Sequence, residues 1–223
     1  MQFNFSWDAS VSSAPAAFKA AVLAAGQQFA TYFADNITVN LNVGWGEAGG
    51  AAVTSPVAAG SFVQSPTTYD DFAANLAAVA ASGDDQSTVG ALNYLSVSGG
   101  AAPFNVANAQ SKAFGLIAPT ATAADGSIGF SAGVTWDFDP SNGISVGAYD
   151  FFAAFAHAAS HAMGRVNDGA NDPLSLFSFT ASGTPAAANA TNAYLSMDGG
   201  VTKLASFLSS GDLSDFSLPG ADA

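Results

Sequence analysis

The sequence predicts an α+β fold, in which a twisted mixed sheet packs on long helices and on a buried central helix at residues 150–164. Two segments, 2–7 and 37–45, alternate polar and apolar residues as half-buried strands do. Residues 14–35 repeat apolar side chains at helical spacing, and Pro15 suits the first turn of that helix. The central segment is apolar nearly all round, which is typical of a helix buried on most sides.

The remaining elements are predicted from shorter patterns. Before the central helix we expect a weak strand or loop at 56–65, helices at 67–82 and 105–116, a hairpin or strand at 125–136, and a turn at 137–143. After it we expect short strands in LSLFSF and AYLSM, a DGG turn at 198–200, a short helix at 202–208 and an acidic GDLSD loop. No linker-like run divides the chain. Residues 1–223 are therefore expected to form one domain, in which the sheet and the long helices occupy residues 1–164 and a smaller C-terminal region occupies residues 165–223.

The composition excludes several classes of partner. The formal net charge is −13, and the only basic residues are Lys19, Lys112, Arg165 and Lys203. Nucleic acids and anionic membranes bind proteins through clusters of basic residues, so neither is an expected partner. No apolar run reaches the roughly 18–20 residues that cross a bilayer, so no membrane insertion is expected. The chain has no cysteine, so packing or bound ions must stabilise it in place of disulfides.

The predicted central helix carries both histidines of the chain, His157 and His161. Residues four apart lie on one helix face, roughly 5–6 Å apart at Cβ. Asp150 is the expected N-cap, and Gly164 is the expected left-handed residue after the last turn. The histidine spacing is that of the H-E-x-x-H zinc motif, in which the Glu is the general base. Ala158 stands in the position of that Glu.

Five segments give the chain a resemblance to a known family. They are, in order, VGWGEAGG (43–50), HAASHAMGR (157–165), PLSLFSF (173–179), YLSMDGG (194–200) and GDLSDF (211–216). Together they resemble the ordered motifs of secreted bacterial zincin-like metallopeptidases, whose helix reads H-E-[IV]-[ST]-[HE]-x-[LM]-G-R. The resemblance implies a zincin-like fold, leaderless export to the cell surface or the medium, and a parent chain that continues beyond Ala223. Cytoplasmic retention is the alternative, because the N-terminus lacks the basic and apolar regions of a signal peptide.

The chain departs from the family pattern at the residues that would carry catalysis. Ala158 replaces the general base, and Ser175 and Ser178 stand where the family has the Asp and the Arg of a D-L-F-R segment. A single Glu-to-Ala change would indicate an engineered inactive enzyme. Several departures together indicate drift after activity was lost.

His157 and His161 are the candidate zinc ligands, and the third ligand is predicted to be Asp168 or Asp172. The alternative is that both imidazoles are satisfied by backbone groups or by an Asp, without a metal.

Two other acidic features are candidates for chemistry. Glu47, the only Glu of the chain, is a remote candidate for a displaced general base, although a turn residue is the simpler interpretation. Asp137 and Asp139 are candidates for Ca²⁺ binding through oxygen, but their spacing does not match an EF-hand loop. A solvated Asp turn is the simpler interpretation there.

These observations predict a non-catalytic metallopeptidase-like protein, or pseudoprotease, that is secreted or surface-exposed and acts by binding or self-assembly. Its surface has few charges and gives little protection against self-association. The strand at 37–45 is the candidate for an open edge, to which another copy of the chain or a peptide or protein ligand would add. The alternative is a zinc-dependent endopeptidase, either active with an unusual base or inactivated by an engineered Glu-to-Ala change at Ala158.

Overall fold

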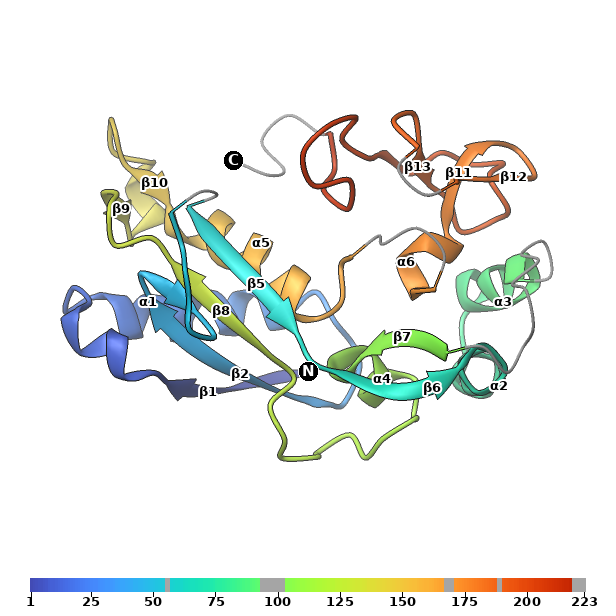
Figure 1. Ribbon diagram of the computed structural model, residues 1–223, viewed down its shortest axis with the longest axis horizontal. Coiled ribbons are helices and arrows are strands. Elements are labelled where there is room, and N and C mark those ends of the chain that lie inside the picture. Colours follow the sequence, from blue (N-terminus) through green and yellow to red (C-terminus); the bar gives the residue numbers. More distant parts are fainter. Residues whose placement is uncertain (55–56, 93–102, 167–170, 188–189, 218–223) are drawn as a thin grey trace.

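The computed structural model describes residues 1–223 except 55–56, 93–102, 167–170, 188–189 and 218–223 (Figure 1). Its architecture is mixed α+β, which confirms the α+β class that the sequence predicts. The main sheet has four strands, in the order β1 (Gln2–Trp7), β2 (Thr38–Trp45), β8 (Gly126–Phe130) and β5 (Ala58–Phe62). The first three strands are parallel, and β5 runs antiparallel at one edge of the sheet.

β2 lies inside this sheet, so the expectation of an open strand edge at 37–45 is wrong. It pairs with β1 on one side and with β8 on the other. Of the polar residues in its alternating pattern, Thr38 and Asn42 are half-buried and Asn40 is buried. The side-chain amide of Asn40 donates to the carbonyls of Ala121 and Ala123 at 2.8 and 3.2 Å. The strands at the two edges of the sheet are β1 and β5.

The helices α1 (Phe18–Ala30) and α5 (Phe151–Ala162) contact each other and the main sheet. Phe155 of α5 is fully buried at the centre of an aromatic cluster. Its ring centroid lies 6.0–6.3 Å from those of Phe3, Phe5 and Phe29. This cluster anchors the central helix to both the sheet and α1.

A second apolar cluster lies beside the sheet core. The antiparallel pair of β6 (Gln64–Thr68) and β7 (Pro103–Ala107) lies in this region of the molecule (Figure 1). The helices of the same region are α2 (Tyr69–Val79), α3 (Gly83–Ala91), α4 (Asn108–Ala113) and α6 (Pro173–Leu176). Its buried residues include Phe72, Phe104, Val106, Leu176 and Phe177. Segments that precede and follow the central helix therefore share one core.

The C-terminal region contains a sheet of four short strands, in the order β12 (Thr184–Pro185), β11 (Ser178–Ala181), β13 (Tyr194–Leu195) and β14 (Ala205–Ser206). The predicted helix at 202–208 is therefore wrong. Asp198 accepts a hydrogen bond from the backbone N–H of Thr202 at 2.8 Å, which closes a turn, and Ala205 then pairs with Leu195. The other short elements are the hairpin of β3 (Glu47–Ala48) and β4 (Ala51–Ala52), the parallel pair β9 (Trp136–Asp137) and β10 (Tyr149–Asp150), and 3₁₀ turns at Ala9–Ser13 and Pro140–Asn142.

Helix boundaries differ from the predictions in three places. α1 is shorter than the predicted helix at 14–35. The helix predicted at 105–116 begins only at Asn108, because the residues before it pair with β6. The helix predicted at 67–82 ends at Val79, and the GDD segment, expected only as a break, begins α3. Ser82 and Asp85 form the capping box that starts this additional helix.

A fully buried ion pair joins α4 to the main sheet. Lys112 Nζ lies 2.6 Å from Asp125 Oδ2, and both side chains are 0% exposed. Lys112 also donates to the carbonyl of Thr38 at 2.8 Å, and Asp125 Oδ2 accepts the backbone N–H of Asn40 at 2.6 Å. Buried charges are tolerated where they are paired and hydrogen-bonded, so this contact specifies how α4 docks against β2.

Acid is expected to destabilise the protein between about pH 4 and pH 2. Hydrogen bonds from Thr202 and Ser196 lower the pKa of Asp198 from 3.8 to about 2. Hydrogen bonds from nearby serines likewise lower the pKa values of Asp85, Asp137 and Asp139. A carboxylate whose pKa is lowered by folding stabilises the fold fully above its unfolded value, and that stabilisation disappears as the pH falls through the folded value.

Urea denaturation at a series of acidic pH values measures this effect. The denaturation midpoint is expected to fall as the pH falls through this range, and Asp198→Asn is expected to make the fall shallower. A wild-type midpoint that stays constant through the same range would contradict the expectation.

Candidate metal centre

The central helix begins and ends at the caps that the sequence predicts. Asp150 accepts hydrogen bonds from the backbone N–H groups of Phe152 and Ala153 at 2.8 and 3.2 Å, as an N-cap does. Gly164 follows the last turn with a φ of +105°, a conformation that residues with a Cβ rarely adopt. The two caps set the length of α5 and therefore the position of the residues on its faces.

α5 has one apolar face and one face that carries polar side chains. The apolar face is fully buried against the sheet and α1; it comprises Phe151, Phe155, Ala158, Ala159 and Ala162. The other face carries His157 and His161, whose ring centroids lie 4.7 Å apart. The four-residue spacing thus brings the two imidazoles together as predicted.

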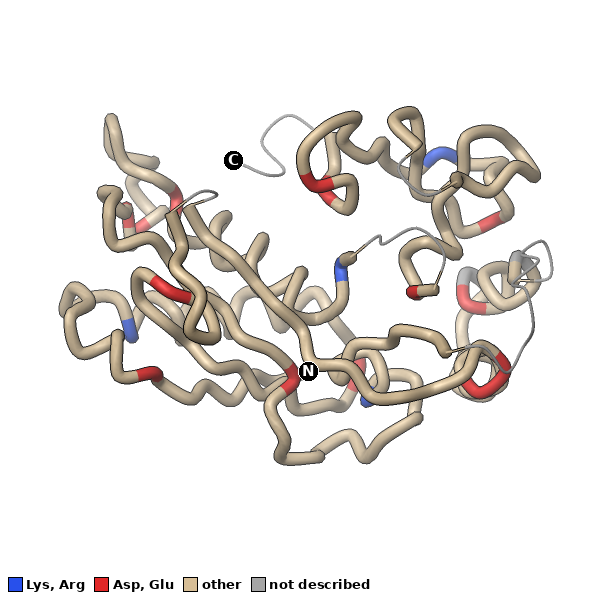
Figure 2. The backbone as a smooth tube through the Cα atoms, in the orientation of Figure 1, with Lys and Arg blue, Asp and Glu red and all other residues tan. Residues whose placement is uncertain are grey.

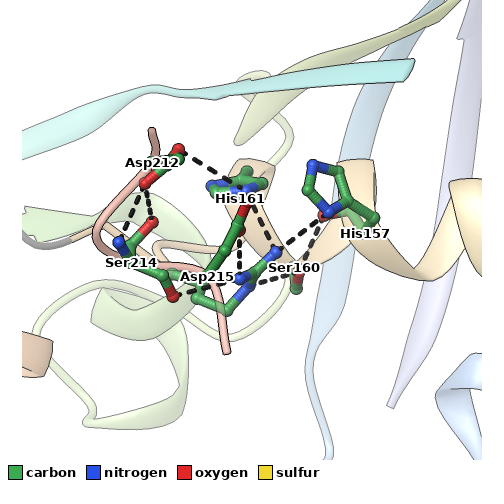
Figure 3. Close-up of polar contacts among 7 residues, drawn as sticks. His157, Ser160, His161, Asp212, Ser214 and Asp215 are labelled. Atoms are coloured by element: carbon green, nitrogen blue, oxygen red, sulfur yellow. Dashed lines mark hydrogen bonds and ion pairs between the residues drawn. The ribbon is translucent and has the colours of Figure 1, made fainter. Parts of the chain in front are cut away.

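The C-terminal segment adds a carboxylate to this histidine pair (Figure 3). Asp215 Oδ1 lies 3.0 Å from His161 Nε2, and their side chains are only 10% and 8% exposed. Ligand atoms of His157, His161 and Asp215 all lie within 4.8 Å of one another. Among the residues that the structure describes, this is the only such group of three His, Asp or Glu side chains. Two imidazoles and one carboxylate are donors typical of zinc.

The guanidinium of Arg165 contacts all three of these donors. Its Nη2 lies 3.0 Å from His161 Nε2 and 3.3 Å from His157 Nδ1. Its Nη1 contacts Asp215 Oδ1 at 2.5 Å. Two further hydrogen bonds fix the guanidinium, from Nη1 to the Ser214 carbonyl at 3.0 Å and from Nε to the Ser160 hydroxyl at 2.9 Å. Arg165 therefore ties α5 to the C-terminal segment.

The electrostatics of the cluster keep Asp215 ionised. Burial by itself raises the pKa of Asp215, but the hydrogen bond with His161 and the electrostatic interactions with Arg165, His157 and His161 outweigh it. The pKa of this carboxyl group is therefore below its ordinary value. Either a metal cation or a guanidinium requires the ionised form as its partner.

The donor types fit Zn²⁺, but the guanidinium of Arg165 contacts the same donor atoms. Zinc holds nitrogen and oxygen donors at about 2.0–2.2 Å, which in a tetrahedron places the donors roughly 3.4 Å apart. The donor atoms here are separated by up to 4.8 Å, so small side-chain movements must close the site. The guanidinium must also leave the donors before a metal ion can bind between them.

A buried methyl group stands where the H-E-x-x-H motif has its Glu. Ala158 is 0% exposed, and its backbone lies directly against β5. At Gly60 of β5, an added Cβ would overlap the carbonyl oxygen of Ala158. Loss of a general base typically slows a reaction by about 10²–10⁴-fold. α5 therefore presents the two histidines without a proton acceptor at this position.

The other residues predicted for this site lie elsewhere or outside the described chain. Asp172 is not the third donor in the cluster; it is the N-cap of α6, where it accepts the backbone N–H of Ser175 at 2.9 Å and the Ser175 hydroxyl. Asp168 lies outside the described residues. Glu47 accepts the hydroxyl of Ser10 at 2.8 Å and a backbone N–H of the β3–β4 turn at 2.5 Å, and it is not part of the donor group.

Asp137 and Asp139 form a hydrogen-bonded turn. Asp137 accepts the backbone N–H groups of Asp139 and Ser145 at 3.0 and 2.8 Å, and Asp139 accepts that of Ser141 at 3.0 Å. These bonds stabilise the ionised carboxylates without an ion. These contacts form the predicted turn, and calcium binding at this turn stays a prediction.

Two members of the cluster were missed by sequence reasoning. Asp215 lies 54 positions after His161, and the only available signal was the acidic GDLSD loop in which it stands. Arg165 follows the helix directly, but its direction depends on the turn at Gly164 and on the C-terminal segment.

Figure 2 shows acidic residues in every region of the described chain and the few basic residues far apart from one another. No described helix is both long enough and apolar enough to span a membrane.

Comparison of the chain with family models, curated proteins and solved structures found no match in any of the three.

Proposed function

We propose that this protein is a non-catalytic zincin-like protein that binds Zn²⁺ through His157, His161 and Asp215 and acts by binding rather than by hydrolysis. The observation that carries the proposal is the grouping of these three donors beside a buried alanine, Ala158, in place of the base. The resemblance of the motifs to secreted bacterial zincin-like metallopeptidases supports the zincin-like fold and a secreted or surface-exposed setting.

The open edge of the main sheet supports a binding role. In zincins, an edge strand beside the central helix pairs with an extended peptide. β5 is antiparallel, stands at the edge of the sheet and lies along α5 (Figure 1). We propose this edge as the place where a peptide segment, or a strand of another copy of the chain, adds to the sheet.

Zinc, when bound, supplies a Lewis acid that polarises a carbonyl group or a water. The residues of this chain then determine the fate of a bound peptide. His157, His161 and Asp215 would hold the ion, and Asp215 would also balance part of its charge. Ala158 cannot accept a proton, so a bound peptide would be retained and not cleaved.

A zinc-dependent endopeptidase is the second candidate, and one observation favours it. Asp212 Oδ2 lies 3.9 Å from His161 Nε2, and its side chain is 54% exposed. A solvated carboxylate at this distance could take a proton from a water near the donors. Under this alternative, Asp212 performs the role that Glu has in the family motif.

Zinc binding by matched variants tests the proposal. Wild-type protein is expected to bind one Zn²⁺ per chain in calorimetry, and His161→Ala or Asp215→Ala is expected to weaken binding by at least about 100-fold. Asp172→Asn is the matched control: it removes another buried carboxylate charge, and its zinc affinity is expected to match that of the wild type.

A peptidase assay separates the two candidate functions. The non-catalytic proposal expects no cleavage of unfolded protein substrates above the chelator-treated control. Cleavage that a chelator abolishes and that Asp212→Asn also abolishes would establish the endopeptidase instead. Absence of histidine-dependent zinc binding would overturn both candidates.

A further inference from the structure

We propose that Arg165 is a built-in competitor for the metal ion: its guanidinium holds the three donors closed, and a cation binds only when Arg165 swings out. This inference rests on the proposed function, because it concerns the regulation of the same site. It assigns Arg165 a role in setting which cations, and at which concentrations, the site accepts.

The geometry of Arg165 carries the inference. One nitrogen, Nη2, lies within 3.0 and 3.3 Å of ring nitrogens of His161 and His157, and the other terminal nitrogen contacts Asp215. These are the same three residues that form the candidate metal site. The guanidinium therefore lies against the same atoms that a metal ion would need.

Charge makes the two states mutually exclusive. The side chains of Arg165 and Asp215 are only 13% and 10% exposed, so water screens the site weakly. A dication within a few ångströms of a guanidinium is strongly repelled in such surroundings. Asp215 contributes a single negative charge, and Asp212, which lies 3.9 Å from His161 Nε2, is 54% exposed, so that water screens its charge.

The structure also provides room for the displaced side chain. A cavity of about 430 Å³ borders the site; its lining is mostly apolar and also includes Arg165 itself, Ser160 and Asp35. The guanidinium already lies 5.9 Å from the Phe216 ring centroid, a distance compatible with a cation–π contact. Movement into this cavity breaks the hydrogen bond from Arg165 to the Ser214 carbonyl, so metal binding is coupled to the docking of the C-terminal segment.

Zinc affinity of Arg165 variants tests the competitor role. If the guanidinium closes the site nine-tenths of the time, Arg165→Met is expected to bind Zn²⁺ about tenfold more tightly than the wild type. Lys203→Met is the matched control, because it also removes one positive charge but at a distant position over the Tyr194 ring. Its affinity is expected to stay within about twofold of the wild type, since surface charges are screened.

A second measurement uses the wild-type protein and does not depend on the variant folding. Arg165 is the only arginine of the chain, so its Nε–Hε group gives a single, assignable NMR resonance. Zinc titration is expected to shift this resonance toward the position of a solvent-exposed arginine, as the bond from Nε to Ser160 breaks.

The outcomes separate the two levels of the proposal. Zinc binding by the wild type with no tightening in Arg165→Met, or with an unchanged arginine resonance at saturation, would overturn the competitor role and leave the metal site standing. Zinc binding by Arg165→Met but not by the wild type would support the competitor role, because the guanidinium would then keep the site closed throughout. Absence of histidine-dependent binding in both proteins would overturn the metal site and the competitor role together.

Discussion

Replacing Lys112 with methionine is expected to lower the free energy of unfolding by about 3–5 kcal/mol, because it leaves a buried carboxylate without its partner. Asp125 is fully buried, and its Oδ2 would keep only the hydrogen bond from the backbone of Asn40. Its Oδ1 has no hydrogen-bond partner among the described residues, so nothing else offsets the lost charge. Chemical denaturation of the wild type and the variant measures the difference.

The control is the double variant Lys112→Met, Asp125→Asn. The neutral amide can still accept the N–H of Asn40 and carries no charge to desolvate, so the double variant is expected to recover most of the lost stability. Lys203→Met, at the surface, is expected to change stability by less than about 0.5 kcal/mol. A Lys112→Met protein as stable as the wild type would show that the charge of Asp125 is not buried in solution.

Phe155→Ala is expected to destabilise the protein by a similar amount, about 3–5 kcal/mol. The side chain is 0% exposed, and its ring extends from α5 into the space between that helix, β1 and α1. Truncation leaves a cavity that the surrounding aromatic rings cannot close. Because the same helix carries His157 and His161, the zinc affinity of the variant is expected to fall as well.

Phe152→Ala is the matched control on the same helix. Phe152 is only half buried, so its truncation removes less apolar area from the core and is expected to have a clearly smaller effect. Equal losses of stability in the two variants, measured by urea denaturation, would contradict the placement of Phe155 at the centre of the cluster.

The central helix was predictable because its signals are local. Asp150 and Gly164 mark its ends, and the spacing of His157 and His161 fixes their shared face. The position of β2 was not predictable in the same way, because alternation shows only that a strand has two different faces. Here the polar face is partly buried as well, and its Asn40 meets residues 121–125, which are more than 80 positions away in the sequence.

The candidate site was likewise predictable only where it depends on residues that are close together in the sequence. Two of its donors follow from one helical turn, whereas the third depends on the path of the whole C-terminal region. Asp172 has the right chemistry and is closer in sequence to the histidines, but a local capping role holds it in α6. A carboxylate that lies close to the histidines in sequence therefore does not identify the third donor, because helix caps nearby compete for the same side chains.

The contact between His161 and Asp215 closes a loop across 54 positions of the chain. The entropy of closing such a loop in the unfolded state grows only with the logarithm of its length, so one firm connection restrains a long stretch of chain. The chain has no cysteine, and this cluster is a non-covalent connection that restrains the chain in the way a disulfide does in other proteins. Whichever cation holds it, metal or guanidinium, the cluster adds a polar connection between the C-terminal segment and the central helix to the apolar core that residues before and after the helix share.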